Sequence, residues 1–288
     1  MKKNMKILVL GASGMLGNAI FKYLSRKKDW DVYGTARSIS LENYLDLDLA
    51  KKVIYDVDVE NSNSINSVFS NIKPDIVINC IGVIKQLDEV NNPLIAISIN
   101  SLAPHRLARL CETYNSRFIH ISTDCVFSGS RGNYNELDFC DADDLYGRSK
   151  FLGEVLYPNS VTLRTSIIGH ELFSDNSLIN WFLSQNESVK GYTNAIFSGL
   201  PTVELARVIG DFVIPNLNLS GLYHIAGEPI SKYDLLNLVA QIYGKRIQII
   251  PDYSVIINRS LNASKFLKAS GYSAPQWKEL VTMMYEFR

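Results

Sequence analysis

Three glycines at a regular spacing follow the first apolar run of the chain. The run Lys6–Leu10 (KILVL) is typical of a short buried strand, and Gly11, Gly14 and Gly17 come directly after it. The amphipathic stretch Asn18–Ser25 then predicts a helix. Glycines at this spacing permit a tight turn and let backbone N–H groups approach a pyrophosphate, which the N-terminus of the helix attracts. The pattern therefore predicts a dinucleotide-binding turn.

Strand-like and helical patterns alternate through the first half of the chain. Continuous apolar runs such as Asp75–Cys80 (DIVINC) are typical of strands that a parallel sheet buries on both faces. Repeated strand–helix units of this kind predict an α/β fold with a Rossmann-type, doubly wound parallel sheet. The predicted strands are Lys6–Leu10, Asp31–Thr35, Val53–Val59, Asp75–Cys80, Arg117–Ser122 and Val161–Arg164, and the helices between them are Asn18–Ser25, Ile65–Asn71, Ser98–Tyr114 and Leu145–Leu156.

The rhythm changes after about residue 165, where helical patterns are separated by polar loops that contain Gly and Pro. No repeat and no low-complexity linker divides the two halves. We predict that residues 1–165 form the dinucleotide-binding domain with the catalytic residues. Residues 166–288 are expected to form mainly a smaller, mixed substrate-binding lobe, with some segments returning to the first domain. The predicted helices of this part are Leu178–Leu183, Thr202–Val213, Lys232–Tyr243, Ala263–Ser270 and Trp277–Phe287.

Charge and cysteine content exclude several classes of protein. Lys plus Arg and Asp plus Glu both number 29, so the net charge is 0. Binding to nucleic acid, or to a membrane through a polybasic anchor, needs a basic surface instead. No stretch of 18 apolar residues predicts a membrane span. The four cysteines form no CxxC pair, so we expect no zinc or other metal site. We expect a cytoplasmic protein with reduced thiols.

The residues after the second predicted strand indicate which dinucleotide binds. An NAD site places a carboxylate there to hold the ribose hydroxyls, whereas this chain has Arg37 and Ser38. A guanidinium pairs well with a 2′-phosphate and Ser38 can add a hydrogen bond, so the pattern favours NADPH. Asp58 and Val59, at the end of the third predicted strand, are expected beside the adenine. Further cofactor-binding candidates are Ser13, Met15, Leu16, Cys80, Ile81 and Gly82.

Tyr146 and Lys150 are four residues apart in a predicted helix and therefore share one face of it. A nearby ammonium favours the phenolate and lowers the pKa of a tyrosine, which can then exchange a proton with a substrate oxygen. The fifth predicted strand ends in Ser122, Thr123 and Asp124, at the sheet edge where ligands of open α/β sheets bind. The glycine turn, the strand-end hydroxyl and the Tyr-x-x-x-Lys pair together indicate an enzyme site more sharply than any one alone.

With these motifs the sequence resembles the extended short-chain dehydrogenase/reductase family, and within it the branch similar to dTDP-4-dehydrorhamnose reductase. The motifs that match the family are closely spaced over residues 5–166. Beyond residue 166 the match is loose and consists chiefly of Gly199-Leu-Pro-Thr202, which precedes a predicted helix. The residues that carry it are Gly11, Gly14 and Gly17, Asp75–Cys80, Ser122–Phe127 with Gly129, Tyr146–Glu154 and Leu163–Ser166.

The resemblance implies an NADPH-dependent reductase of a nucleotide-linked 4-keto-6-deoxyhexose. It implies that Tyr146 protonates the C4 oxygen as hydride arrives, and that Lys150 binds the nicotinamide ribose and depresses the tyrosine pKa. Thr123 is expected to hydrogen-bond the substrate carbonyl. Asn100 matches the structural or proton-relay asparagine of the family and is a further cofactor-binding candidate. A homodimer through the predicted helices Ser98–Tyr114 and Leu145–Leu156 is likewise a family expectation.

Two positions depart from the rhamnose-type pattern, which has an aromatic residue where this chain has Cys125 and a tryptophan where it has Ile167. Both belong to the sugar pocket, so the sequence favours a UDP-linked 2-acetamido-2,6-dideoxy-4-hexulose over the dTDP-linked sugar. In related epimerase/reductases a cysteine at the first position removes a proton beside the ketone. A thiol whose pKa a cation lowers could do this at C3 and C5, whereas a small buried filler is the alternative role of Cys125.

The remaining candidates concern the substrate and the rival functions. The substrate-binding candidates are Lys85, Thr123, Asp124, Ile167, Trp181 and Lys190, and the second acid of an epimerase would be His170, Lys190 or Lys85. A 4,6-dehydratase or 4-epimerase is one rival, although the Asp-Glu pair of the dehydratases is here Asp124-Cys125. A non-catalytic NADP-binding regulatory subunit, similar to the methionine adenosyltransferase accessory proteins, is the other.

Overall fold

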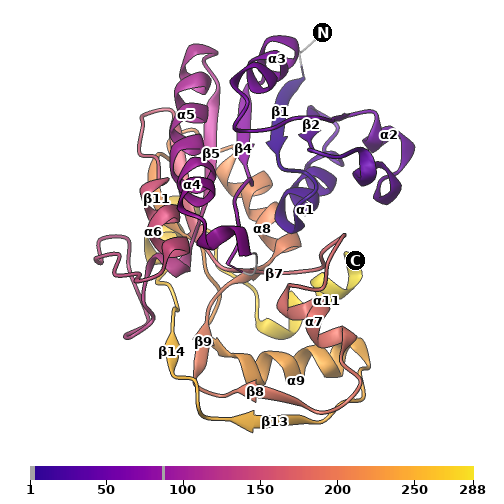
Figure 1. Ribbon diagram of the computed structural model, residues 1–288, viewed down its shortest axis with the longest axis vertical. Helices are drawn as coiled ribbons and strands as arrows, with labels where there is room; N and C mark the ends of the chain where they lie inside the picture. The colour runs from indigo at the N-terminus through magenta and orange to yellow at the C-terminus, as the bar shows by residue number, and fades with distance from the viewer. Residues whose placement is uncertain (1–3, 86–87) are drawn as a thin grey trace.

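A seven-stranded, fully parallel sheet forms the centre of the computed structural model, which describes residues 4–85 and 88–288 (Figure 1). Its strand order is β11-β6-β5-β4-β1-β2-β3, so the order reverses beside β1. Ligands of open α/β sheets bind at such a reversal, beyond the carboxyl ends of the strands. The strands are β1 (Met5–Leu10), β2 (Trp30–Thr35), β3 (Val53–Ile54), β4 (Ile76–Asn79), β5 (Arg117–Thr123), β6 (Ser160–Thr165) and β11 (Gly221–His224).

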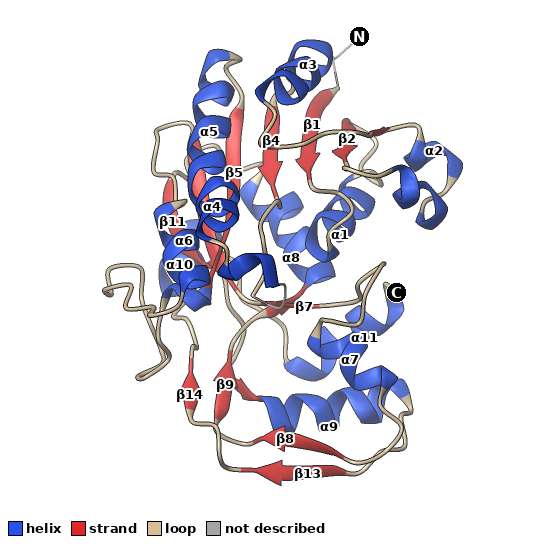
Figure 2. Cartoon of the chain, in the orientation of Figure 1, coloured by secondary structure: helices blue, strands red, loops and turns tan. Residues whose placement is uncertain are grey.

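Helices cover both faces of the sheet (Figure 2). Side chains of β1 alternate between two apolar clusters, with Ile7 and Val9 in one and Leu8 and Leu10 in the other. The first cluster packs against α1 (Met15–Leu24) and α8 (Thr202–Val208), which continues as a π-turn over Ile209–Val213. The second packs against α3 (Ser62–Ile72) and α5 (Ala103–Thr113). This burial on both faces explains the unbroken apolar runs of the strands.

The helices near the carboxyl ends of the central strands lie between β4 and β6 in the sequence. A helical segment begins with α4 (Pro93–Ala96), passes through a π-turn over Ile97–Leu102 and continues as α5. The helix α6 (Leu145–Leu152) packs against that π-turn and against β5. Three short 3₁₀ turns lie at Ile39–Tyr44, Asp88–Asn91 and Asp124–Val126, and α2 spans Leu47–Ala50.

The second part of the chain carries short strands and helices below the carboxyl edge of the large sheet (Figure 1). β8 pairs with β13, β7 with β10, and β9 lies between β12 and β14. The strands are β7 (Ile167–Ile168), β8 (Val189–Tyr192), β9 (Ala195–Phe197), β10 (Leu200–Pro201), β12 (Ile230–Ser231), β13 (Ile249–Asp252) and β14 (Ile257–Asn258). The helices there are α7 (Leu178–Ser184), α9 (Lys232–Tyr243) and α11 (Trp277–Glu286), whereas α10 (Ser264–Ser270) packs beside β11 of the large sheet.

The predicted doubly wound parallel sheet is confirmed, with two elements shorter than expected. The third strand was predicted to run to Val59, but only Val53 and Ile54 pair with β2, because the backbone turns at Asp56 with a φ of 57°. The helix predicted over Leu145–Leu156 ends at Leu152. The short strands of the second part were not predicted, since runs of two to four residues show no periodicity. Within residues 4–85 and 88–288, none of the helices has the length and apolar character needed to cross a membrane.

Candidate active site

The turn after β1 has the geometry that the glycine spacing predicted. Gly11 has a φ of +84°, a left-handed conformation that glycine adopts without strain. Its N–H donates to Thr35 Oγ1 at 3.2 Å, and the N–H of Gly14 donates to its carbonyl at 3.0 Å. A Cβ on Gly17 would fall on that same carbonyl, so only glycine lets α1 pack this closely on the turn. Gly14 is the N-cap of α1 and leaves the first N–H groups of the helix directed at the cleft.

The residues predicted to contact the adenosine end lie on the surface beyond β2 and β3. Arg37, Ser38 and Asp58 are exposed, and Ser38 accepts the N–H of Ser40 at 3.2 Å as the cap of a 3₁₀ turn. Asp58 accepts the N–H of Glu60 at 3.0 Å. The guanidinium of Arg37 is thus accessible to a phosphate.

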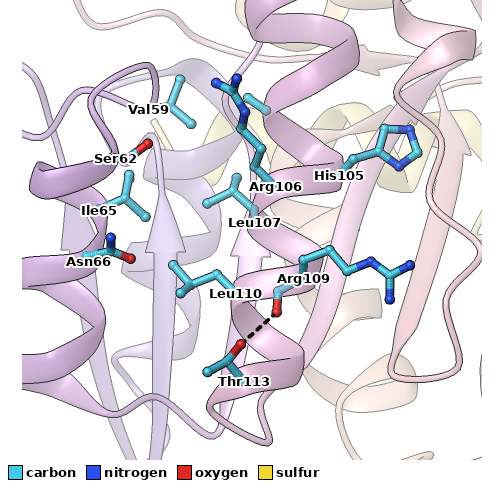
Figure 3. A pocket seen from close by; sticks show the side chains of 11 residues that line it. Val59, Ser62, Ile65, Asn66, His105, Arg106, Leu107, Arg109, Leu110 and Thr113 are labelled. Atoms are coloured by element: carbon cyan, nitrogen blue, oxygen red, sulfur yellow. Dashed lines mark hydrogen bonds between the residues drawn. The ribbon is translucent and has the colours of Figure 1, made fainter.

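A separate hollow lies between α3 and α5 (Figure 3). Val59 and Ile65 line one wall, and Arg106, Leu107 and Leu110 line the other. The hollow contains none of the predicted catalytic residues. Val59 is the one cofactor-binding candidate that lines it.

The predicted catalytic residues meet in a cleft of about 530 Å³ at the carboxyl ends of the central strands. The cleft joins the glycine turn, the loop after β4, the end of β5 and the start of α6 on one side to segments of the second part on the other. Thirteen of the predicted site residues line it: Gly14, Met15, Leu16, Cys80, Ile81, Gly82, Lys85, Thr123, Asp124, Cys125, Tyr146, Lys150 and Ile167.

Tyr146 and Lys150 project from α6, whose N-cap is Asp144. The Asp144 carboxylate accepts the N–H of Gly147 at 2.7 Å and pairs with Lys85 at 2.5 Å. The ammonium of Lys150 is buried and donates to the carbonyl of Ile121 on β5 at 2.8 Å. Burial lowers the pKa of Lys150 to about 8.

Burial also raises the pKa of Tyr146 above its ordinary value, and the nearby Cys125 raises it further. The lowered pKa that was expected for Tyr146 is therefore not found in the structure, where burial dominates. The reason is that burial removes water from the phenol, an effect that sequence spacing does not reveal. A raised pKa keeps Tyr146 protonated at neutral pH, which is the state that a proton donor needs.

Thr123 ends β5 with its hydroxyl facing the cleft. Its Oγ1 accepts the N–H of Cys125 at 3.1 Å and donates to Asp124 Oδ1 at 3.2 Å. Burial and the charge of Asp124 raise the pKa of the Cys125 thiol to about 12. Arg259 and Lys85 lower this pKa, as expected of nearby cations, but burial and Asp124 outweigh them, so the expected net lowering is wrong.

Asn100 lies behind the cleft rather than in it. Its side chain is buried in the π-turn, where Oδ1 accepts the N–H of Val83 at 2.9 Å and Nδ2 donates to the carbonyl of Val83 at 3.1 Å. Nδ2 also lies 3.3 Å from Ser149 Oγ. Asn100 thereby ties the loop after β4 to α6, which is a structural use of its polar atoms.

Two substrate-binding candidates lie outside the cleft lining as the structure describes it. Lys190 is exposed on β8 and pairs with Asp252 at 3.2 Å, because alternate side chains of that strand face solvent. Trp181 is half-exposed on α7. His170, a candidate second acid, pairs with the hydroxyl of Tyr243 at 2.8 Å, and burial lowers its pKa.

Sequence reasoning missed Lys232, which the second part brings to the cleft together with Phe197 and Arg259. The ammonium of Lys232 lies 5.7 Å from the centre of the Phe197 ring, and burial lowers its pKa. Arg259 Nε donates to the carbonyl of Phe127 at 2.8 Å. Lys232 simply follows the N-cap Ser231 of α9, so no sequence pattern marks it. Across the described residues, no three His, Cys, Asp or Glu side chains are grouped as metal ligands would be.

Comparison with known proteins agrees with this geometry. The model of the RmlD substrate binding domain family matches residues 5–287, which is nearly the whole chain. The protein belongs to this family. Members of the family and their structural neighbours therefore provide the comparison for its site.

Among relatives, dTDP-4-dehydrorhamnose reductase of Aggregatibacter actinomycetemcomitans is 27% identical over 95% of this chain and 96% of its own length. Methionine adenosyltransferase 2 subunit beta of Danio rerio is 26% identical over 83% of this chain and 74% of its own. A dTDP-4-dehydrorhamnose reductase of Bacillus anthracis, solved in complex with NADP, superposes with a TM-score of 0.81 at 21% identity and covers 99% of this chain and 100% of its own. At that identity the likeness establishes the fold.

Proposed function

We propose that the protein is an NADPH-dependent reductase of the C4 ketone of a nucleotide-linked 4-keto-6-deoxyhexose. The observation that carries the proposal is the meeting of Thr123, Tyr146 and Lys150 in one cleft with the glycine turn of α1. The dTDP-4-dehydrorhamnose reductase of Aggregatibacter actinomycetemcomitans, 27% identical along nearly its entire length, supports the same reaction class.

The residues of the chain divide the reaction between them. The cofactor, when bound, supplies the hydride that adds to the carbonyl carbon. The Thr123 hydroxyl, which donates to Asp124 Oδ1 in the structure, turns to donate to the carbonyl oxygen and holds it beside Tyr146, whose phenol delivers the proton that completes the alcohol. Lys150, fixed by the Ile121 carbonyl, holds the ribose hydroxyls and stabilises the phenolate that remains. The N–H groups at the start of α1 bind the pyrophosphate.

Arg37 and Ser38 favour NADPH over NADH. Both lie exposed immediately after β2, where a carboxylate would hold the ribose hydroxyls in an NAD site. A guanidinium attracts the 2′-phosphate that distinguishes the two cofactors. The Bacillus anthracis reductase in complex with NADP supports this choice.

UDP-linked and dTDP-linked 4-keto sugars are the two substrates to compare, because Ile167 lines the cleft where the dTDP-specific pattern has a tryptophan. Epimerisation at C3 or C5 through Cys125 would require a thiolate, which the raised pKa of that thiol disfavours. We therefore propose reduction alone as the activity.

We also propose that the protein forms a homodimer. Exposed apolar side chains gather on α4, the π-turn, α6 and the loop after it, which suits a homodimer interface of the kind expected for the family; they are Leu94, Ile97, Leu102, Phe151, Leu152 and Leu156.

Residues 1–165 are proposed as the NADPH domain and residues 166–288 mainly as the substrate lobe, although β11 and α8 of the second part pack in the first.

Turnover is tested by following NADPH oxidation at 340 nm while a 4,6-dehydratase generates the keto-sugar in situ from dTDP-glucose or UDP-GlcNAc. We expect turnover with one series, a loss of about 10²–10⁴-fold in Tyr146→Phe, and wild-type rates in Tyr192→Phe on β8. If wild type binds NADPH but reduces neither sugar, the likeness to methionine adenosyltransferase 2 subunit beta becomes the better guide and a regulatory subunit replaces the reductase.

A further inference from the structure

A buried ion pair lies immediately behind the catalytic residues and is not used by the proposed reaction. Arg164, at the end of β6, donates from Nε to Glu154 Oε1 at 2.7 Å and from Nη2 to Glu154 Oε2 at 2.6 Å. Both side chains are less than a tenth exposed. This bidentate geometry fixes the orientation of the Glu154 carboxylate as well as its position.

Neighbouring elements hold the guanidinium in turn. Arg164 Nη1 lies 3.3 Å from His224 Nε2 on β11, and Nη2 donates to Cys140 Sγ at 3.2 Å. His224 Nδ1 pairs with the carbonyl of Tyr134 at 3.0 Å, and burial lowers the pKa of this histidine to about 3. His224 is therefore neutral, with a proton on Nδ1 and a free acceptor at Nε2 for Arg164.

The carboxylate links this pair to the catalytic strand. Glu154 Oε1 also accepts the hydroxyl of Ser122 at 2.7 Å, and Ser122 directly precedes Thr123 at the end of β5. Glu154 itself follows α6, four residues after Lys150. One side chain therefore joins the strand that carries the threonine hydroxyl to the helix that carries the tyrosine and the lysine.

We propose that Glu154 and Arg164 are positioning residues, which hold the end of β5 and the Thr123 hydroxyl in register with Tyr146 and Lys150. This inference rests on the proposed reductase activity. Neither residue is required to touch substrate or cofactor; both act through the groups that do.

The charge of Glu154 also affects the pKa of Lys150. The titratable groups that face Lys150 are Glu154 and Tyr146 on its own segment, Cys80 after β4 and His120 on β5. Burial raises the pKa of Cys80 to about 12 and lowers that of His120 well below its usual value, so both are neutral at pH 7. Within the described residues, Glu154 is thus the charged neighbour that favours the ammonium of Lys150, and it raises the pKa of that lysine.

The test compares Glu154→Gln with the matched variant Glu204→Gln. Glu204 on α8 is equally buried and is held by Arg207 through two contacts of 2.8 Å, but it lies away from the cleft. We expect Glu154→Gln to reduce kcat roughly tenfold and to move the alkaline limb of the kcat/KM profile about one pH unit lower. Glu204→Gln should leave that limb at its wild-type position.

Two further variants separate positioning from charge. Ser122→Ala removes one hydrogen bond and leaves the ion pair intact, so it should fold, lose kcat several-fold and keep the wild-type alkaline limb. Glu154→Asp keeps the charge and should restore that limb without restoring kcat. Hydrogen exchange of the β5 peptide should be faster in Glu154→Gln and Ser122→Ala but not in Glu204→Gln.

The two proposals fail in different ways. If wild type reduces no keto-sugar, the proposed function is wrong, while the pH dependence of NADPH binding and the exchange of β5 still report on the ion pair. If Glu154→Gln and Ser122→Ala keep the wild-type kcat, or if Glu204→Gln shifts the alkaline limb as Glu154→Gln does, the positioning role is refuted.

Discussion

Gly17 provides the sharpest test of how the cofactor turn is built. A Cβ at this position would fall on the carbonyl oxygen of Gly11 and lie 2.8 Å from its carbonyl carbon. Both are backbone atoms, so no rotamer change relieves the overlap and α1 must move away from the turn. Such overpacking costs about 3 kcal/mol, while the higher helix propensity of alanine returns about 1 kcal/mol. We expect Gly17→Ala to lower the free energy of unfolding by about 2 kcal/mol and Tm by roughly 4–8 °C.

Gly14→Ala is the matched control, because a Cβ there would lie 3.5 Å from the same oxygen, an ordinary contact distance. We expect its Tm to stay close to that of wild type. Its methyl group would still face the cleft in front of the first N–H groups of α1, so NADPH should bind at least about tenfold more weakly. Thermal unfolding followed by circular dichroism and titration of NADPH fluorescence measure the two effects. Equal Tm values for Gly17→Ala, Gly14→Ala and wild type would refute the packing argument.

Three other outcomes follow from the site. Arg37→Ser should weaken NADPH binding by about tenfold, the value of a lost charged hydrogen bond, and leave NADH binding nearly unchanged; equal losses for both cofactors in the same titration would contradict the assigned role. Because burial lowers the pKa of Lys150 to about 8, its ammonium loses the proton as pH rises through that value, and kcat/KM should fall on the alkaline side. A kcat/KM profile that stays flat to about pH 10 would contradict the role of the Lys150 ammonium. Because the Cys125 thiol has a pKa of about 12, Cys125→Ser should keep turnover and leave deuterium uptake at C3 and C5 unchanged, as followed by NMR in heavy water; loss of such uptake in the variant would restore the epimerase hypothesis.

The first half of the chain could be predicted because its signals are local. The glycine turn, the apolar strands and the Tyr146–Lys150 spacing each depend on neighbours within a few residues, and the βα rhythm then places strand ends at one edge. The positions of Thr123, Tyr146 and Lys150 in one cleft follow from those signals.

The substrate side could not be predicted in the same way. Lys232 and Phe197 reach the cleft through contacts between segments far apart in sequence, and their own neighbourhoods look like any helix start or short strand. Trp181 and Lys190 were chosen from the same region by residue type, yet their elements direct them elsewhere. The pKa directions of Tyr146 and Cys125 failed for a related reason, since spacing reveals a charged neighbour but not the loss of water around a buried group.

The position of β11 has a consequence for how the chain is made. All six residues of β6 are buried, and β11 covers the outer edge of that strand along Val161–Arg164. During synthesis β6 emerges about sixty residues before its partner, so its row of backbone N–H and C=O groups stays unpaired until Gly221–His224 leave the ribosome. A fragment cut at residue 165 would keep that open edge permanently and would be prone to pair with other copies. The nucleotide-binding half therefore depends on the second half to finish its own sheet.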